Sequence, residues 1–207
     1  KKVIIILSLL VIGLFISGFN EDKKEVATPS KISHSTSLNY VKTEAESNQL
    51  EHQIPFISNN FIGFKEALAF KESQGRYDVV NTLGYLGKYQ FGKSTLERFR
   101  IYDTTLFLET PELQEKAFIA LCSLNKWILI RDIKRSVGKT INGVEITESG
   151  ILAAAHLSGA GNVKKYLRSN GSFQFNDAYG SSIRNYMKKF SGYDTSSIKA
   201  IKKPVIS

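Results

Sequence analysis

Apolar residues recur at steps of three and four over much of the chain beyond residue 56, which is typical of amphipathic helices. The first such segment carries Phe61, Phe64 and Leu68 on one face. Polar residues 58–60 offer N-caps for this helix, and Gly75 is a natural stop. The pattern therefore predicts a helix that begins near residue 60 and ends just before Gly75.

A longer helix is predicted from Thr110 to about Arg135. Its start is marked by a capping threonine, then Pro111 at the first helical position, then the acidic Glu112 in the first turn. The apolar repeat predicts which face packs in the core. That face carries Leu113, Ala117, Leu121, Leu124 and Ile128.

Shorter signals fill the rest of the domain. A capping box at Ser94–Glu97 predicts a short helix, and Asn142-Gly143 between apolar residues predicts a small hairpin. Thr147 is the expected cap of an alanine-rich helix that ends at Ser158-Gly159. Two more helices are expected near 163–167 and 177–190. The predicted fold class is all-α, or α-dominated with a small β-hairpin.

The N-terminal segment has the pattern of an export signal. Lys1 and Lys2 precede an apolar run over 3–16, and small or polar residues follow it. We interpret 1–19 as a signal peptide or an uncleaved N-terminal anchor, because the run is short for a membrane span. The predicted location is therefore the periplasm, the cell envelope or the extracellular space.

Two polar segments flank the predicted domain, which spans 56–193. Residues 20–55 are polar and irregular, so we expect a flexible tether that could connect the domain to the membrane. Residues 194–207 form a short basic tail without periodicity.

The net charge and the cysteine and histidine content indicate which ligands and partners to expect. The formal net charge is +9, which for an exported protein favours an anionic envelope polymer or a membrane surface. The basic residues are spread out, and we expect no nucleic-acid partner. Cys122 is the single cysteine and is predicted to be a small buried residue. With three histidines and no metal-ligand cluster, no metal and no cofactor are expected.

One segment satisfies a nucleotide-binding pattern letter for letter. Gly87 is followed after four residues by Gly92-Lys93-Ser94, which matches the P-loop. A P-loop follows a buried strand and wraps its backbone N–H groups around phosphate, but no Val/Ile-rich run precedes Gly87. Bulky residues 89–91 fill the loop. We therefore reject nucleotide binding.

The same region resembles the active-site segment of the lysozyme-like lytic transglycosylases, which cleave peptidoglycan. Three motifs in the right order carry the resemblance, which spans about 56–193. Glu72-Ser73 is similar to the opening Glu-Ser of the family, with Asn81, Gly84, Gly87 and Gln90 at its later positions. Segment 154–163 is similar to the family's Ala-Tyr-Asn-x-Gly-x-Gly-x-Val element, and 183–187 to its Thr-Arg-x-Tyr-Val element.

The resemblance implies a lysozyme-like fold and cleavage of the β-1,4 MurNAc–GlcNAc bond. Glu72 would be the general acid and then the general base. Residues implied to orient that acid or contact the substrate are Ser73, Gln90, His156 and Tyr186. Tyr89 is added as a substrate contact because aromatic rings suit the faces of sugars. The family's tyrosine near the catalytic acid corresponds to Tyr186.

The chain departs from the family at two positions. His156 stands where the family has tyrosine and Leu157 where it has asparagine. A lone histidine in an alanine-rich helix is also compatible with an ordinary core residue. His156 is therefore either a substitute sugar contact or part of the core.

A second carboxylate is the open question within this hypothesis. Hydrolytic glycosidases pair two, and Asp78 and Asp103 are the candidates. The resembling family can dispense with a second one, because the muramyl 6-hydroxyl attacks the anomeric carbon and leaves a 1,6-anhydro end. Expected partners are peptidoglycan glycan strands, and the protein is expected to be a monomer. The alternatives are a hydrolytic muramidase and a non-catalytic peptidoglycan-binding module.

Overall fold

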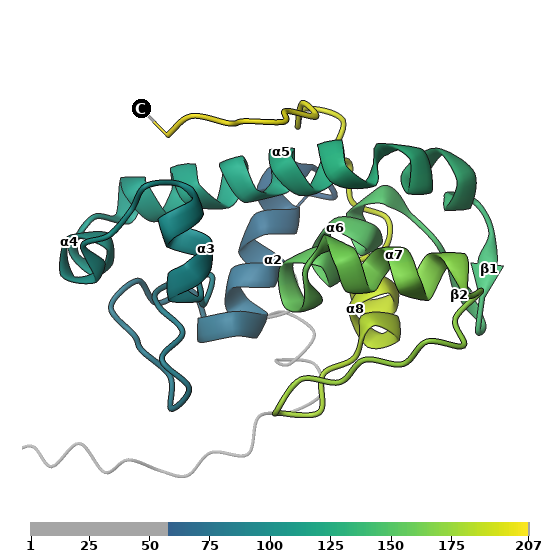
Figure 1. Cartoon of the computed structure of the whole chain (residues 1–207), viewed down its shortest axis with the longest axis horizontal. Coiled ribbons are helices and arrows are strands. Elements are labelled where there is room, and N and C mark those ends of the chain that lie inside the picture. Colours follow the sequence, from purple (N-terminus) through teal and green to yellow (C-terminus); the bar gives the residue numbers. More distant parts are fainter. Residues whose placement is uncertain (1–57, 207) are drawn as a thin grey trace, which may run out of the picture. The chain divides into compact units, whose positions relative to one another are not determined.

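The computed structural model describes residues 58–206, which lie within one compact unit of the chain, His52–Ser207. The predictions for 1–19 and 20–55 concern residues outside this range. The described residues contain seven α-helices and one two-stranded antiparallel sheet, so the α-dominated prediction is confirmed (Figure 1). In chain order the elements are α2 Phe61–Ser73, α3 Lys93–Arg98, α4 Thr104–Glu109, α5 Pro111–Ser136, β1 Thr140–Ile141, β2 Val144–Glu145, α6 Glu148–Ser158, α7 Ala160–Arg168 and α8 Ile183–Lys189.

Helix α2 begins and ends where its local signals predict. The Asn60 side chain accepts a hydrogen bond from the Gly63 backbone N–H at 3.0 Å, which satisfies one of the free donors of the first turn. At the other end Gln74 and Gly75 both adopt positive φ and turn the chain out of the helix. This exit leaves Glu72 in the last turn of α2.

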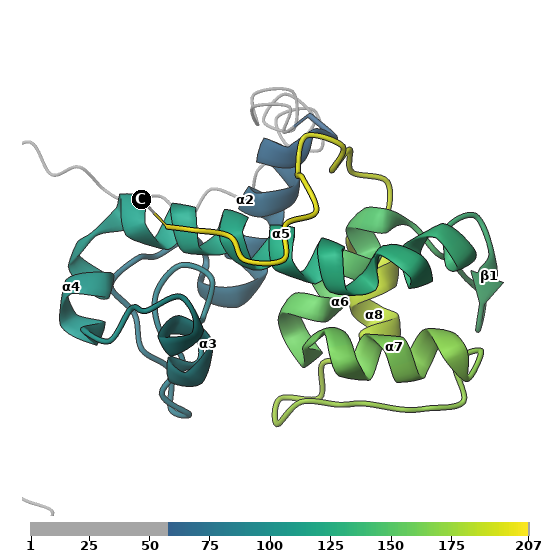
Figure 2. The same ribbon diagram turned by 45° about the horizontal axis from the view of Figure 1, so that its top comes forward.

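Helix α5 is the longest element, crosses α2 and packs against α4, α6 and α7 (Figures 1 and 2). Its extent is as predicted, and its predicted face packs in or against the core. Ala117 and Leu124 are buried, and Leu113, Leu121 and Ile128 are half-buried and pack against the core. Buried polar side chains that the apolar pattern does not predict also lie on this helix, among them Gln114, Ser123, Asn125 and Asp132.

Two helix starts differ from prediction. Helix α3 begins at Lys93 with Gly92 as its N-cap, so Ser94 lies inside the helix and makes no side-chain cap. Helix α8 begins after Ser182, whose hydroxyl accepts from the Asn185 N–H at 3.1 Å. The residues before it, from Asp177, form a turn rather than a helix.

The remaining local predictions are confirmed. Asn142 and Gly143 both have positive φ and connect β1 to β2, as a two-residue hairpin turn requires. Thr147 caps α6 through a 3.1 Å contact from the Gly150 N–H. Cys122 is buried.

The C-terminal segment packs along α5, although it contains no helix or strand within the described residues (Figure 2). Ile198 is buried, and the Ile201 N–H donates to the Ser123 carbonyl at 3.1 Å. The Lys202 ammonium lies 5.3 Å from the centre of the Trp127 ring. Among residues 58–206 no helix is both long and apolar enough to cross a bilayer.

Candidate functional site

Glu72 and Tyr186 come together from opposite ends of the described chain. The Tyr186 hydroxyl donates to Glu72 Oε1 at 2.7 Å, across 114 positions of sequence. Glu72 is half-buried in the last turn of α2, and Tyr186 is buried in α8. The proximity that the resemblance implied for Tyr186 is therefore present.

The environment keeps Tyr186 protonated, so it acts as a hydrogen-bond donor. Burial raises the pKa of the Tyr186 phenol well above its usual value, and the neighbouring Glu72 carboxylate and the more distant Asp177 raise it further. Because the phenol keeps its proton, it can donate a hydrogen bond to Oε1 of Glu72.

The Ser73 side chain bonds to the backbone of the following loop and not to Glu72. Its hydroxyl donates to the Lys88 carbonyl at 2.8 Å and lies 3.2 Å from the Arg76 carbonyl. The side chain is buried and ties the end of α2 to the following loop. The prediction that Ser73 contacts the substrate is therefore corrected to a role in holding this loop.

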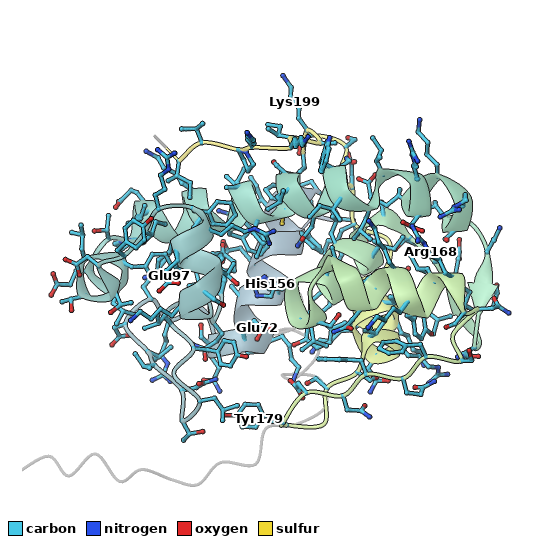
Figure 3. The ribbon with its side chains drawn as sticks, in the orientation of Figure 1. Glu72, Glu97, His156, Arg168, Tyr179 and Lys199 are labelled. Atoms are coloured by element: carbon cyan, nitrogen blue, oxygen red, sulfur yellow. The ribbon has the colours of Figure 1, made fainter. Side chains whose placement is uncertain are left out.

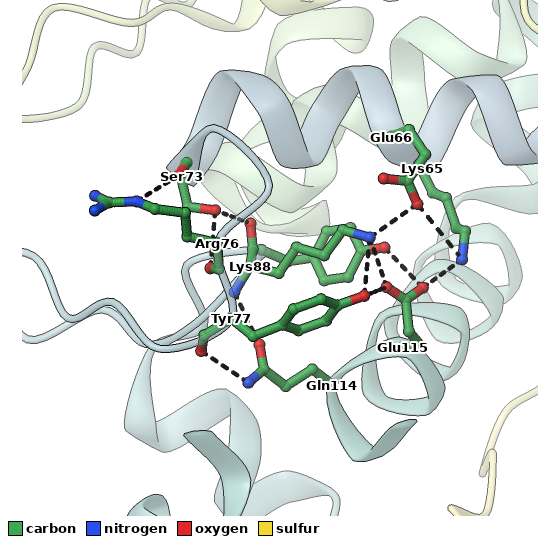
Figure 4. A network of polar contacts seen from close by, with 9 residues as sticks. Lys65, Glu66, Ser73, Arg76, Tyr77, Lys88, Gln114 and Glu115 are labelled. Atoms are coloured by element: carbon green, nitrogen blue, oxygen red, sulfur yellow. Dashed lines mark hydrogen bonds and ion pairs between the residues drawn. The ribbon is translucent and has the colours of Figure 1, made fainter. Parts of the chain in front are cut away.

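An ion cluster around the buried Lys88 anchors the same loop to α2 and α5 (Figure 4). Glu115 of α5 accepts from the Lys88 ammonium at 2.7 Å and also pairs with Lys65, and Glu66 accepts from Lys88 at 2.8 Å. The Tyr77 and Tyr89 hydroxyls donate to Glu115 at 2.8 and 2.9 Å. Burial alone would raise the pKa of Glu115, but these donors, Lys65 first, outweigh it and lower the pKa to about 2.

Tyr89 belongs to the core and to this cluster. Its side chain is 0% exposed, and its ring stacks on Phe118 with a centroid distance of 4.1 Å. The prediction that Tyr89 contacts the substrate is corrected, because a fully buried ring offers no surface to a ligand.

The Gly87–Gly92 loop has a different geometry from a phosphate-binding loop. Leu86 and Phe91 exchange backbone hydrogen bonds of 2.9 and 2.8 Å, which folds the loop back on itself. Gly87 has positive φ, and a Cβ on it would lie 2.1 Å from the Gln114 amide oxygen. The glycine is required for close packing against α5. The residues that match the P-loop pattern thus form a tight turn that packs against Gln114 of α5.

A cavity of about 820 Å³ lies beside this loop. Its lining comes from the 83–98 segment, from α5, from the α6–α7 junction and from Phe175. Gln90 and His156, both predicted substrate contacts, are brought together here. Glu72 is outside the lining, and in the view of Figure 3 it lies between His156 and Tyr179.

The electrostatic character of the cavity favours a neutral or anionic ligand. Lys93 and Arg98 contribute basic side chains to its edge, and none of the described residues that line it is acidic. A polymer that carries carboxylates meets no like charge there. Gln90 has positive φ, and its amide nitrogen donates to the Gly87 carbonyl at 2.9 Å, which leaves its amide oxygen as the available acceptor.

His156 contacts core residues and also lines the cavity. Its Nε2 lies 2.8 Å from the Tyr89 carbonyl, so this nitrogen carries the hydrogen. Phe91 and Phe118 pack against the ring edge-to-face, and among the described residues the buried Nδ1 has no hydrogen-bond partner. His156 thus holds α6 to the loop, and any contact with a ligand is through the ring.

Asn125 is a cavity residue that sequence reasoning missed. It is a buried amide on α5 and lines the cavity together with Leu121 and Ile128, which stand four residues before it and three after. The available signal was a polar residue at helical spacing within an apolar stripe. Leu157, at the position where the family has asparagine, also lines this cavity.

The two candidate second carboxylates do not join this cavity. Asp103 caps α4 by accepting from the Leu106 N–H at 2.9 Å and lines a separate cavity of about 1250 Å³. Asp78 is exposed and is not among the cavity-lining residues. Asp177, which sequence reasoning did not consider, is near enough to raise the pKa of Tyr186.

No described group of three or more His, Cys, Asp or Glu side chains has the arrangement of a metal site. No protein-family model matches the chain, and neither a curated protein nor a solved structure matches it significantly.

Proposed function

We propose that this protein is a peptidoglycan lytic transglycosylase of lysozyme-like fold, with Glu72 as its catalytic acid and base. The observation that carries the proposal is the 2.7 Å contact between Tyr186 and Glu72. It joins the first and the last of the three motifs that resemble the family. The intermediate motif, at the α6–α7 junction, lines the neighbouring cavity with Gln90.

The reaction needs no second carboxylate and no cofactor. Glu72 donates its proton to the glycosidic oxygen as the bond from the muramyl C1 to that oxygen breaks. The muramyl 6-hydroxyl then attacks C1 and closes the 1,6-anhydro ring, and Glu72 takes the hydroxyl proton back. Tyr186 orients the carboxyl group throughout, because its hydroxyl fixes one carboxyl oxygen and leaves the other facing the ligand.

Charge and location are consistent with this substrate. Peptidoglycan strands carry carboxylates, and the cavity edge carries Lys93 and Arg98 without a described acidic residue. The export signal predicted in 1–19 would deliver the protein to the cell envelope, where that polymer is found.

The test is the chemistry of the new chain ends. The protein is incubated with purified peptidoglycan, and the released muropeptides are separated and weighed by mass spectrometry. We expect fragments that are lighter by one water than hydrolysis products, because the anhydro ring forms without water. Reducing muramic ends would make the protein a hydrolase, and binding to the wall without any release would make it a binding module.

Asn125 is expected to supply the sugar contact that the family takes from its asparagine. Asn125→Ala should lower kcat/KM for wall cleavage about tenfold, since the change removes a hydrogen bond that polar substrates use in the cavity. The measurement is the initial rate of release of soluble muropeptides. Asn59→Ala, a change at an exposed asparagine before α2 and outside the cavity lining, is the control and should keep the wild-type rate. Equal rates for both variants would contradict the assignment.

A further inference from the structure

Two turns far apart in sequence meet tip to tip. The hydroxyls of Thr82 and Tyr179 are 2.8 Å apart, across 97 positions of the chain. Thr82 lies in the 80–86 turn that follows α2, and Tyr179 lies in the 176–182 turn that precedes α8. Both residues are exposed, Tyr179 by 61%, so the contact is separate from the core.

The first turn is shaped by its own hydrogen bonds. Val80 and Leu86 form a β-bridge at its neck. Within the turn the Asn81 side-chain oxygen accepts from the backbone N–H groups of Leu83 and Tyr85 at 2.9 and 3.0 Å. These bonds order the backbone on both sides of Thr82.

The second turn has the same construction. Asn176 and Ser182 form a bridge at its neck, and Asp177 Oδ1 accepts from the N–H groups of Tyr179 and Ser181 at 2.9 and 2.6 Å. Two turns that are each ordered by a side chain therefore present one hydroxyl to the other. Little conformational entropy is lost when they join.

The tip contact closes a ring that includes the proposed catalytic acid. From Glu72 the chain runs to Thr82, crosses the 2.8 Å contact to Tyr179, continues to Tyr186 and returns to Glu72 through the 2.7 Å hydrogen bond. Leu83 and Phe175, from the segments that carry the two tips, both line the cavity. In Figure 3 Tyr179 lies on the far side of Glu72 from His156.

We propose that the Thr82–Tyr179 contact determines where along a glycan strand this protein cuts. With the contact closed, a strand reaches Glu72 only by inserting a free end, so cleavage proceeds from strand ends. With the contact open, a strand can be laid in sideways and cut at internal bonds. This inference rests on the proposed function, since it concerns access of the same polymer to the same acid.

The experiment is a double-mutant cycle on cleavage position. Full-length protein is incubated with glycan strands of known length, and the strand-length distribution is followed from the earliest time points. Thr82→Val and Tyr179→Phe each remove one hydroxyl and keep the size of the side chain. We expect the ratio of internal to terminal cuts to rise about fivefold in each, as loss of one hydrogen bond predicts. The double variant should give no further rise, because both changes break the same contact.

Tyr102→Phe is the matched control, because Tyr102 is 69% exposed and lines the other cavity. It should keep the wild-type ratio. If wild-type protein cuts at internal bonds from the start and the Thr82 and Tyr179 variants share its length distribution, this inference fails while the proposed function stands. If wild-type protein leaves the strands intact, both fail.

Discussion

Glu72→Gln is expected to lower the rate of wall cleavage about a thousandfold, since general acid–base catalysis contributes about 10² to 10⁴. Glutamine keeps the shape of the side chain and can still accept the hydrogen bond from Tyr186. It has no proton to give to the glycosidic oxygen. The fold and the affinity for peptidoglycan should therefore be retained while release of soluble muropeptides stops. The measurement combines a release assay with pelleting of protein by insoluble wall.

The matched control is Glu97→Gln, at an exposed position of α3 (Figure 3). It changes the same charge and should cleave at the wild-type rate. Tyr186→Phe leaves the acid in place and removes only its orienting donor, so a smaller loss of about tenfold is expected. A Glu72→Gln protein with full activity would place the catalytic acid elsewhere and end the proposal.

The features that the sequence predicts correctly are those with local causes. The Asn60 and Thr147 caps, the Gly75 exit and the Asn142-Gly143 turn are each decided by groups within about four residues. The chemistry of these residues acts on their own backbone, and no distant partner is needed. The two ends of helix α5 are predicted correctly for the same reason.

The errors arise where distant segments decide the outcome. Tyr89 is drawn into the core by Phe118 and by Glu115, 26 positions away. Gly87 is required by Gln114 rather than by a phosphate. The buried residues of α5 include polar side chains, so apolar periodicity alone predicts only part of the buried face. Asn125 was missed for this reason.

Glu115→Gln is expected to lower the free energy of unfolding at pH 7 by about 3 kcal/mol, the range for breaking one partner out of a buried ion pair. Lys88, which is 4% exposed, would lose its 2.7 Å carboxylate partner and keep Glu66 and the Tyr77 hydroxyl. The fall of the Glu115 pKa from 4.5 to about 2 corresponds to a similar energy. Thermal unfolding followed by circular dichroism should show a midpoint lower by about 10 °C.

The pH dependence of stability tests the role of the Glu115 charge by a second, independent measurement. Because the pKa of Glu115 is lower in the folded state, its contribution to stability is full above about pH 4.5 and is lost as the pH falls toward 2. The difference in stability between wild type and Glu115→Gln should therefore shrink steadily between pH 5 and pH 2. Glu112→Gln changes an exposed residue in the first turn of the same helix, and its free energy of unfolding should differ from that of wild type by a constant amount over this pH range. A difference that stays constant over this range would show that Glu115 acts through packing and not through its charge.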